Sequence, residues 1–103
     1  ASILEATLFA THVPLHTMQA SFKVFELCKA MAEEGNPNSV SDAGVGVLAA
    51  RAAVLGAGLN VKINASGLKD REAADKLVGE ANELIKKANE LETEIMKIVD
   101  DKL

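Results

Sequence analysis

A carboxylate and several short polar side chains stand together near the middle of the chain. The carboxylate is Asp42, and the amides and hydroxyls before it are Asn36, Asn38, Ser39 and Ser41. A carboxylate can take a proton from water in general acid–base catalysis, and amides and hydroxyls can hydrogen-bond a substrate. The same residue types also favour turns and helix N-termini. The group is therefore either a substrate site with Asp42 as its catalytic residue, or a helix cap.

An apolar run follows this group and contains isolated polar residues. Positions 43–61 are apolar or small except for Arg51 and Asn60. At 100° per residue, Lys62 lies within about 20° of the direction of Arg51, whereas Asp42 and Asn60 lie on the opposite side. Arg51 and Lys62 could therefore share a helix face and bind an anionic group together.

These polar residues also have structural interpretations. A buried arginine most often forms a structural ion pair, for which Glu5 and Glu26 are the candidate partners. Asn60 and Asn64 are four residues apart on one helix face, where they could bind a substrate, cap the helix or bridge to a neighbouring helix. The sequence leaves these alternatives open.

Histidine and cysteine indicate little further chemistry. His12 and His16 are spaced like a pair of metal ligands, but Pro14 between them predicts a helix start, and no third ligand follows at a suitable spacing. We therefore expect no metal site. Cys28, the single cysteine, is predicted to be a small core residue. It cannot form an internal disulfide, which is typical of a reducing compartment, so we expect a cytoplasmic protein.

The N-terminal third of the chain predicts two helical segments. The first has its apolar residues within 2–11. Its helix ends near Val13, because the residue before a proline is pushed out of the α region. Pro14 then lies in the first turn of the next helix, which runs from about 15 to 34. Gly35 ends that helix in a left-handed conformation.

Two further helices follow. The central helix begins with Ser39 or Ser41 as its N-cap and Asp42 in its first turn, and it ends near Asn64. The final helix begins after Asp70 as N-cap. It carries a narrow heptad seam, spaced alternately by four and three, of Leu77, Ala81, Leu84, Ala88, Leu91, Ile95 and Ile98.

Short connections make successive helices antiparallel neighbours, so the predicted fold is an all-α, up-and-down antiparallel helical bundle. The absence of tryptophan and tyrosine also favours helices with an aliphatic core. The central helix has no polar face, so lipid or protein must surround it. Arg51 near its middle disfavours lipid. We therefore expect upstream helices or a second subunit to complete the bundle.

Length and charge restrict the function further. The 103 residues form one domain at most. The net charge is −4, and no basic cluster exceeds Lys86-Lys87, which argues against nucleic-acid binding. No signal peptide is recognisable, and the chain starts at Ala1 within a helical pattern, so we expect residues upstream.

The central run resembles a known family. The phrase is Gly-Asn-Pro-Asn-Ser-Val-Ser-Asp-Ala-Gly-Val-Gly at 35–46, followed by Ala-Ala-Arg-Ala-Ala at 49–53 and Asn-Val-Lys-Ile-Asn at 60–64. Glu-Ala-Thr at 5–7 and Ala-Thr-His-Val-Pro-Leu at 10–15 fit the same pattern. These motifs resemble the formiminotetrahydrofolate cyclodeaminase and methenyltetrahydrofolate cyclohydrolase family. The resemblance covers residues 1–103 as the C-terminal portion of the family's single domain. The upstream Pro-Gly-Gly-Gly-Ser loop of that family is not in this chain.

The resemblance implies a folate-dependent one-carbon enzyme that interconverts 5-formimino-, 5,10-methenyl- or 10-formyltetrahydrofolate. Asp42 would then transfer a proton or stabilise the cationic one-carbon centre, and the asparagines and serines before it would contact the pterin. Arg51 and Lys62 would bind the glutamate tail. No cofactor is implied beyond tetrahydrofolate as substrate, and the expected assembly is a homodimer. A non-catalytic helical interaction or oligomerisation module is the alternative, because the glycine-rich half of the domain is missing.

Overall fold

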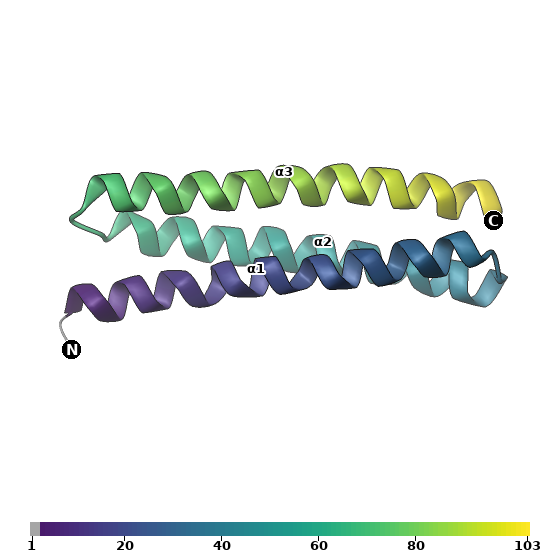
Figure 1. Ribbon diagram of the computed structural model, residues 1–103, viewed down its shortest axis with the longest axis horizontal. Helices are drawn as coiled ribbons and strands as arrows, with labels where there is room; N and C mark the ends of the chain where they lie inside the picture. Colours follow the sequence, from purple (N-terminus) through teal and green to yellow (C-terminus); the bar gives the residue numbers. More distant parts are fainter. Residues whose placement is uncertain (1–2) are drawn as a thin grey trace.

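Three long helices lie side by side in antiparallel order (Figure 1). The computed structural model describes residues 3–103, with side chains from residue 12 onward. The helices are α1 (Ile3–Glu34), α2 (Pro37–Ser66) and α3 (Arg71–Lys102), and no strand occurs among the described residues. The assembly is elongated, with extents of 52 × 21 × 15 Å. The predicted all-α, up-and-down bundle is confirmed.

Helix α1 continues through Pro14, so the predicted break near Val13 is wrong. The segment predicted at 2–11 is the first part of α1, although Ser2 itself lies outside the described residues. Proline lacks an N–H group and leaves one carbonyl of the preceding turn without its helical donor, a cost of about 3 kcal/mol. The next turn offsets this cost, because Leu15 and Met18 are buried in the core at 3 % and 0 % exposure. The packing of α1 against the core therefore outweighs the tendency of a proline to end the helix before it.

The connection between α1 and α2 uses a different cap from the one predicted. Gly35 has a φ of +83°, which confirms its left-handed role. Asn36 is the N-cap of α2: its Oδ1 accepts a hydrogen bond from the backbone N–H of Asn38 at 3.0 Å, and Pro37 occupies the first helical position. Asparagine before proline is a favourable helix start, since the ring fixes φ in the helical range.

The helix therefore begins earlier than expected. Ser39 and Ser41 lie inside α2 and are not its N-cap. Asp42 is the sixth residue of the helix, beyond the first turn, where backbone N–H groups already have helical partners. The helix-cap interpretation of Asp42 is wrong for the same reason.

The connection between α2 and α3 agrees more closely with what the sequence predicts. Asp70 is the N-cap of α3, and its Oδ1 accepts from the N–H of Ala73 at 3.1 Å, as predicted. Helix α2 ends at Ser66, two residues after the predicted end. Arg71 closes the turn by donating to the carbonyl of Leu68 at 2.8 Å.

Heptad spacing also governs the core. In the predicted seam of α3, Leu77, Ala81, Ala88 and Ile95 are buried. The facing side of α2 repeats valine every seven residues, each 0 % exposed, with alanines between them. The valines are Val40, Val47, Val54 and Val61. Valine and alanine keep α2 thin enough to pack against both α1 and α3.

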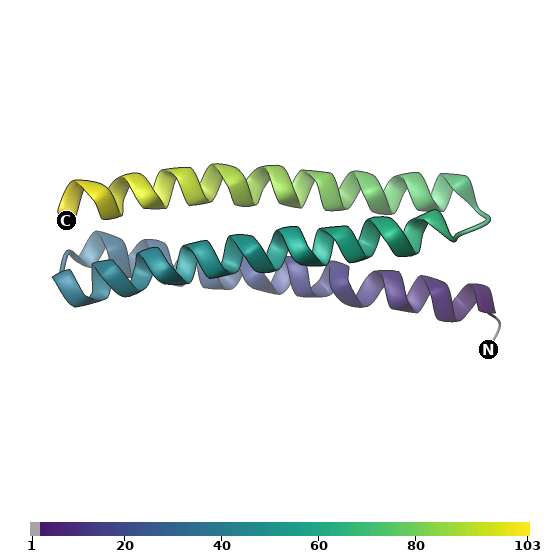
Figure 2. The same ribbon diagram turned by 180° about the vertical axis from the view of Figure 1, so that it is seen from behind.

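Among the described side chains, none covers the opposite side of α2. Figure 2 views the bundle from the side on which α2 lies in front of α1. Helical periodicity puts Val45, Leu59 and Ile63 opposite the buried valine row, and they are 67–68 % exposed. By length and composition alone α2 could cross a membrane, a test that core helices of soluble proteins also pass.

Candidate functional site

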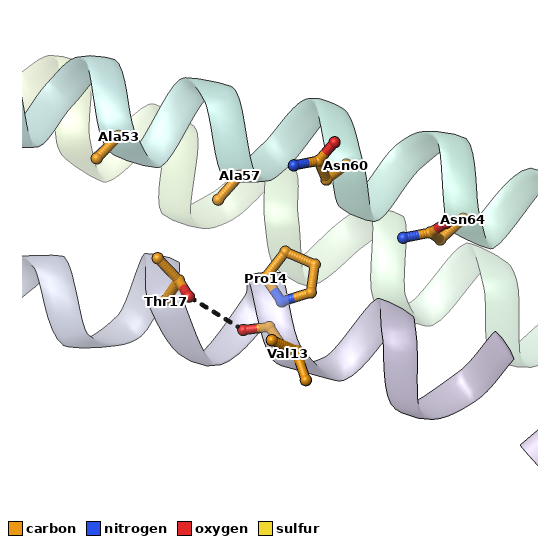
Figure 3. Close-up of a pocket in the computed structure, with 7 residues that line it drawn as sticks. All are labelled: Val13, Pro14, Thr17, Ala53, Ala57, Asn60 and Asn64. Atoms are coloured by element: carbon orange, nitrogen blue, oxygen red, sulfur yellow. Dashed lines mark hydrogen bonds between the residues drawn. The ribbon is translucent and has the colours of Figure 1, made fainter. Parts of the chain in front are cut away.

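A groove with a volume of about 430 Å³ lies between α1 and α2 beside the proline of α1. Figure 3 shows the Pro14 ring directed toward α2, where four side chains follow one another along the facing side of the helix. The groove is lined by Val13, Pro14, Thr17, Ala53, Ala57, Asn60 and Asn64.

The groove combines apolar walls with two amides. Pro14, Ala53 and Ala57 present carbon surface, and Asn60 and Asn64 add carbonyl and NH₂ groups one turn apart. Thr17 Oγ1 donates to the carbonyl of Val13 at 3.2 Å, which ties the hydroxyl to its own helix (Figure 3). Such a site suits a flat ring that carries hydrogen-bonding groups on its edge.

The other predicted substrate residues lie at the far end of α2. Asn38, Ser41 and Asp42 are exposed there, and Ser39 is half-buried. Asn36 is exposed and uses its Oδ1 in the helix cap.

Asp42 is 18 residues from Asn60, which is five helical turns or about 27 Å along the axis. The two side chains therefore point in the same direction without meeting. A single chain does not bring Asp42 and the groove together.

Lysine at the end of α3 adds a charge that the sequence did not indicate. Lys102 Nζ donates to the carbonyl of Glu33 at 2.6 Å, beside the connection that precedes Asn36. This places an ammonium group at the same end of the bundle as Asp42. The sequence held a signal for this contact. Three antiparallel helices of similar length bring the end of α3, and with it Lys102, to the α1–α2 connection.

Arg51 faces α3. Its Nε donates to Oδ1 of Asn89 at 2.7 Å, and the side chain is half-buried. Within the described side chains Arg51 forms no ion pair, and Glu26 is exposed on α1. The other candidate, Glu5, has a side chain outside the described residues. Because asparagine is neutral, the pair with Asn89 keeps the positive charge of the guanidinium.

Lys62 is exposed, 11 residues or about 16 Å along α2 from Arg51. Arg51 and Lys62 share the α3 side of the helix, whereas the amides of Asn60 and Asn64 face α1. The predicted substrate residues therefore form three separate groups.

Cys28 is 4 % exposed, which confirms its predicted place in the core. Burial raises the pKa of the Cys28 thiol, so this cysteine is a weaker nucleophile than an exposed one. On the surface of the bundle, Lys29 Nζ lies 2.8 Å from Oε1 of Glu94. The hydrogen bond and charge of Glu94 raise the pKa of Lys29. Both lysine and glutamate are about half exposed, so the pair contributes little to stability.

His12 and His16 are exposed on the continuous helix α1. The argument that a helix start separates them is therefore wrong, because a single helix carries both, one turn apart. No group of three metal-ligating side chains occurs within the described part of the chain. That the protein binds no metal stays a prediction.

Comparison with known proteins finds similarity over most of the chain. The sequence model of the formiminotransferase-cyclodeaminase family matches residues 1–83. A methenyltetrahydrofolate cyclohydrolase from Methylorubrum extorquens is 42 % identical over 103 residues, which is 100 % of this chain and 50 % of that protein. A formimidoyltransferase-cyclodeaminase from Dictyostelium discoideum is 33 % identical over 93 residues, which is 90 % of this chain and 17 % of that protein. The chain thus spans half the length of the first relative and less of the second.

Proposed function

The chain belongs to the formiminotransferase-cyclodeaminase family, and we propose that it forms the C-terminal portion of a helical domain that converts tetrahydrofolate derivatives. The family match over residues 1–83 carries this proposal. The relative that matches the whole chain is named a methenyltetrahydrofolate cyclohydrolase. We therefore put hydrolysis of 5,10-methenyltetrahydrofolate first, and ring closure of 5-formiminotetrahydrofolate with loss of ammonia second.

Both reactions pass through a tetrahedral carbon between two nitrogens, and both need a proton carrier beside it. In our proposal Asp42 is that carrier, since an exposed carboxylate can accept a proton from the attacking water. Its negative charge also stabilises the cationic one-carbon centre. Asn36, Asn38, Ser39 and Ser41 lie at the same end of α2 as Asp42 and offer further hydrogen-bonding groups to the substrate.

The groove between α1 and α2 is our candidate site for the pterin ring. Asn60 and Asn64 can pair with the donors and acceptors on the edge of the ring, while Pro14, Ala53 and Ala57 contact its face. Arg51 and Lys62 remain candidates for the glutamate tail, with Arg51 held in place by Asn89.

The same proposal covers the assembly, the cofactors and the cellular location of the protein. We propose a cytoplasmic homodimer that needs no metal and no cofactor beyond tetrahydrofolate as substrate. The net charge of −4 supports a protein without a nucleic-acid partner. The hydrogen bond of Arg51 to α3, from the middle of α2, supports a protein outside the membrane.

Calorimetric titration with 5-formyltetrahydrofolate tests the binding site. We expect saturable binding that Asn60→Ala weakens about tenfold, the effect of one lost hydrogen bond of about 1.4 kcal/mol. The matched control is Asn82→Ala, which removes an exposed asparagine of α3 outside the groove. Equal affinity in both variants would remove Asn60 from the site. No binding by the wild-type chain would favour the non-catalytic helical module if the gene encodes a product of this mass, and would place the missing contacts in the other half of the domain if the product is longer.

A further inference from the structure

Arg51 is a half-buried cation that is bonded to a neutral amide. Its Nε donates to Oδ1 of Asn89 on α3 at 2.7 Å. It forms no ion pair with any described side chain, although Glu90 and Glu92 follow Asn89 on the same helix. Arginine is always charged, and a charge that is partly withdrawn from water is costly unless it is paired. The charge of Arg51 therefore lacks a counter-ion in the described part of the chain.

The hydrogen bond uses only part of what the two side chains offer. A guanidinium carries N–H donors on each of its nitrogens. The bond to Asn89 engages Nε–H alone, so the N–H groups on both Nη atoms of Arg51 have no partner among residues 12–103. The amide nitrogen of Asn89 has no partner there either. Free N–H donors beside a positive charge are the groups that bind a carboxylate.

The two helices hold this pair in a rigid frame. Gly44 and Gly58 lie one heptad before and after Arg51 on the same side of α2. An added Cβ would lie 3.3 Å from Val99 at the first glycine and 2.8 Å from Ile85 at the second. Side chains of α3 thus pack against the backbone of α2 on both sides of Arg51. A binding group that is fixed in advance loses less entropy when its ligand arrives.

Apolar side chains flank the charge on α2. Leu48 and Leu55 lie about one turn before and after Arg51, and both are partly withdrawn from water, with Leu48 46 % exposed. Walls of low polarity reduce the screening of a charge by water. Arg51 therefore attracts an anion more strongly than an arginine on an open surface does.

We propose that Arg51 and Asn89 form a carboxylate-binding site in which Asn89 is the positioning residue. The neutral amide directs the guanidinium and leaves its charge to the ligand, whereas a carboxylate at position 89 would neutralise that charge. Asn89 follows residues 1–83, which the family model matches, so that match assigns it no role. The identity of the carboxylate rests on the proposed function: it is the glutamate end of the folate substrate.

Nuclear magnetic resonance tests the pair without any ligand. The chain has two arginines, and the bonds of Arg71 are made by Nη1, so its exposed Nε–H is the internal reference. We expect the Nε–H of Arg51 to exchange with water about tenfold more slowly than that of Arg71. Asn89→Ala should remove the difference. Equal exchange of the two groups in the wild-type protein would overturn the proposal.

Titration with N-(4-aminobenzoyl)glutamate tests what the pair binds, because this part of folate carries both carboxylates and no pterin. It should shift the Nε–H signal of Arg51, and its uncharged diamide should not. Asn89→Asp should weaken the binding about tenfold, because the new carboxylate pairs with Arg51. The matched control is Asn82→Asp, at an exposed asparagine one heptad earlier on the same face of α3. Its charge lies about 10 Å further along the helix and should change the affinity by less than about twofold.

Stability distinguishes positioning from a purely structural role. Asn89→Asp replaces a neutral hydrogen bond by an ion pair, so its Tm should equal or exceed that of Asn82→Asp while its binding is weaker. A lower Tm in Asn89→Asp would overturn the role, because damage to the fold would then explain the weaker binding. Equal affinity in the two variants, or an Arg51 signal that the fragment does not shift in the wild-type protein, would overturn the carboxylate site.

These outcomes are separate from those of the proposed function. A fragment that binds at Arg51 in a protein without 5,10-methenyltetrahydrofolate turnover would refute the enzyme and leave the carboxylate site standing. Turnover together with saturable 5-formyltetrahydrofolate binding that Asn89→Asp does not weaken would refute the carboxylate site and leave the enzyme standing.

Discussion

Replacing Val54 by alanine is the sharpest test of the place of α2 in the core. Val54 is 0 % exposed at the middle of the valine row of α2. The substitution removes two methyl groups, which is about 1.6 kcal/mol of transfer free energy. A cavity between three helices adds to this, and scaling from buried leucine-to-alanine changes gives a total of about 2–3 kcal/mol.

Val24→Ala is the matched control, because Val24 is 42 % exposed on α1. Alanine is the better helix former at both positions, so this gain of about 0.5 kcal/mol cancels when the two variants are compared. We expect the control to change the free energy of unfolding by less than about 0.5 kcal/mol. The difference between the variants therefore isolates burial.

Thermal and urea unfolding followed by circular dichroism, at one protein concentration, gives the result. A loss of 2–3 kcal/mol lowers the Tm by roughly 10–20 °C in a domain of this size. If Val54→Ala lost no more stability than Val24→Ala, the valine row of α2 would not be in the core, and the arrangement of the helices would be refuted.

Three further predictions concern single residues. Asp42→Asn should abolish 5,10-methenyltetrahydrofolate turnover, measured by absorbance, without lowering the Tm, because the side chain is exposed; unchanged turnover would remove Asp42 from catalysis. Asn36→Ala should cost about 1 kcal/mol of unfolding free energy through the lost N-cap of α2, and a stability equal to that of Asn82→Ala would contradict this cap. Cys28 should react slowly with a thiol reagent in native protein and fast in urea, because burial raises its pKa and blocks access. Rapid native labelling would show that the thiol is exposed.

Local signals predicted most of the helical framework. The heptad seam of α3, the N-cap Asp70 and the left-handed Gly35 depend on residues within a few positions of one another. Such patterns are readable from sequence because helix caps and helix faces repeat at fixed spacing. The cap of α2 is equally local, but the prediction placed it at Ser39 or Ser41, whereas Pro37 at the first helical position makes the preceding Asn36 the cap.

Where local sequence rules did not predict the structure, contacts between residues distant in the sequence determined it. Pro14 should end a helix, yet the burial of Leu15 and Met18 against the other helices keeps α1 continuous. For Arg51 the sequence left an ion pair and the binding of an anionic group open, and the register of α3 places Asn89, 38 residues away, at its Nε. Helical periodicity predicts the direction of a side chain and says nothing of which residue lies opposite.

The sequence by itself determined the all-α class, the helix order and the family, because spacing and motifs are properties of the chain. Only the tertiary structure placed Pro14 opposite Asn60 and Asn64 to form a groove. It also placed the groove away from Asp42, because α1 brings Pro14 level with Asn60 and Asn64, about 27 Å along α2 from Asp42. Packing across helices decides which residues of two helices lie opposite each other, and no local pattern along the chain encodes this.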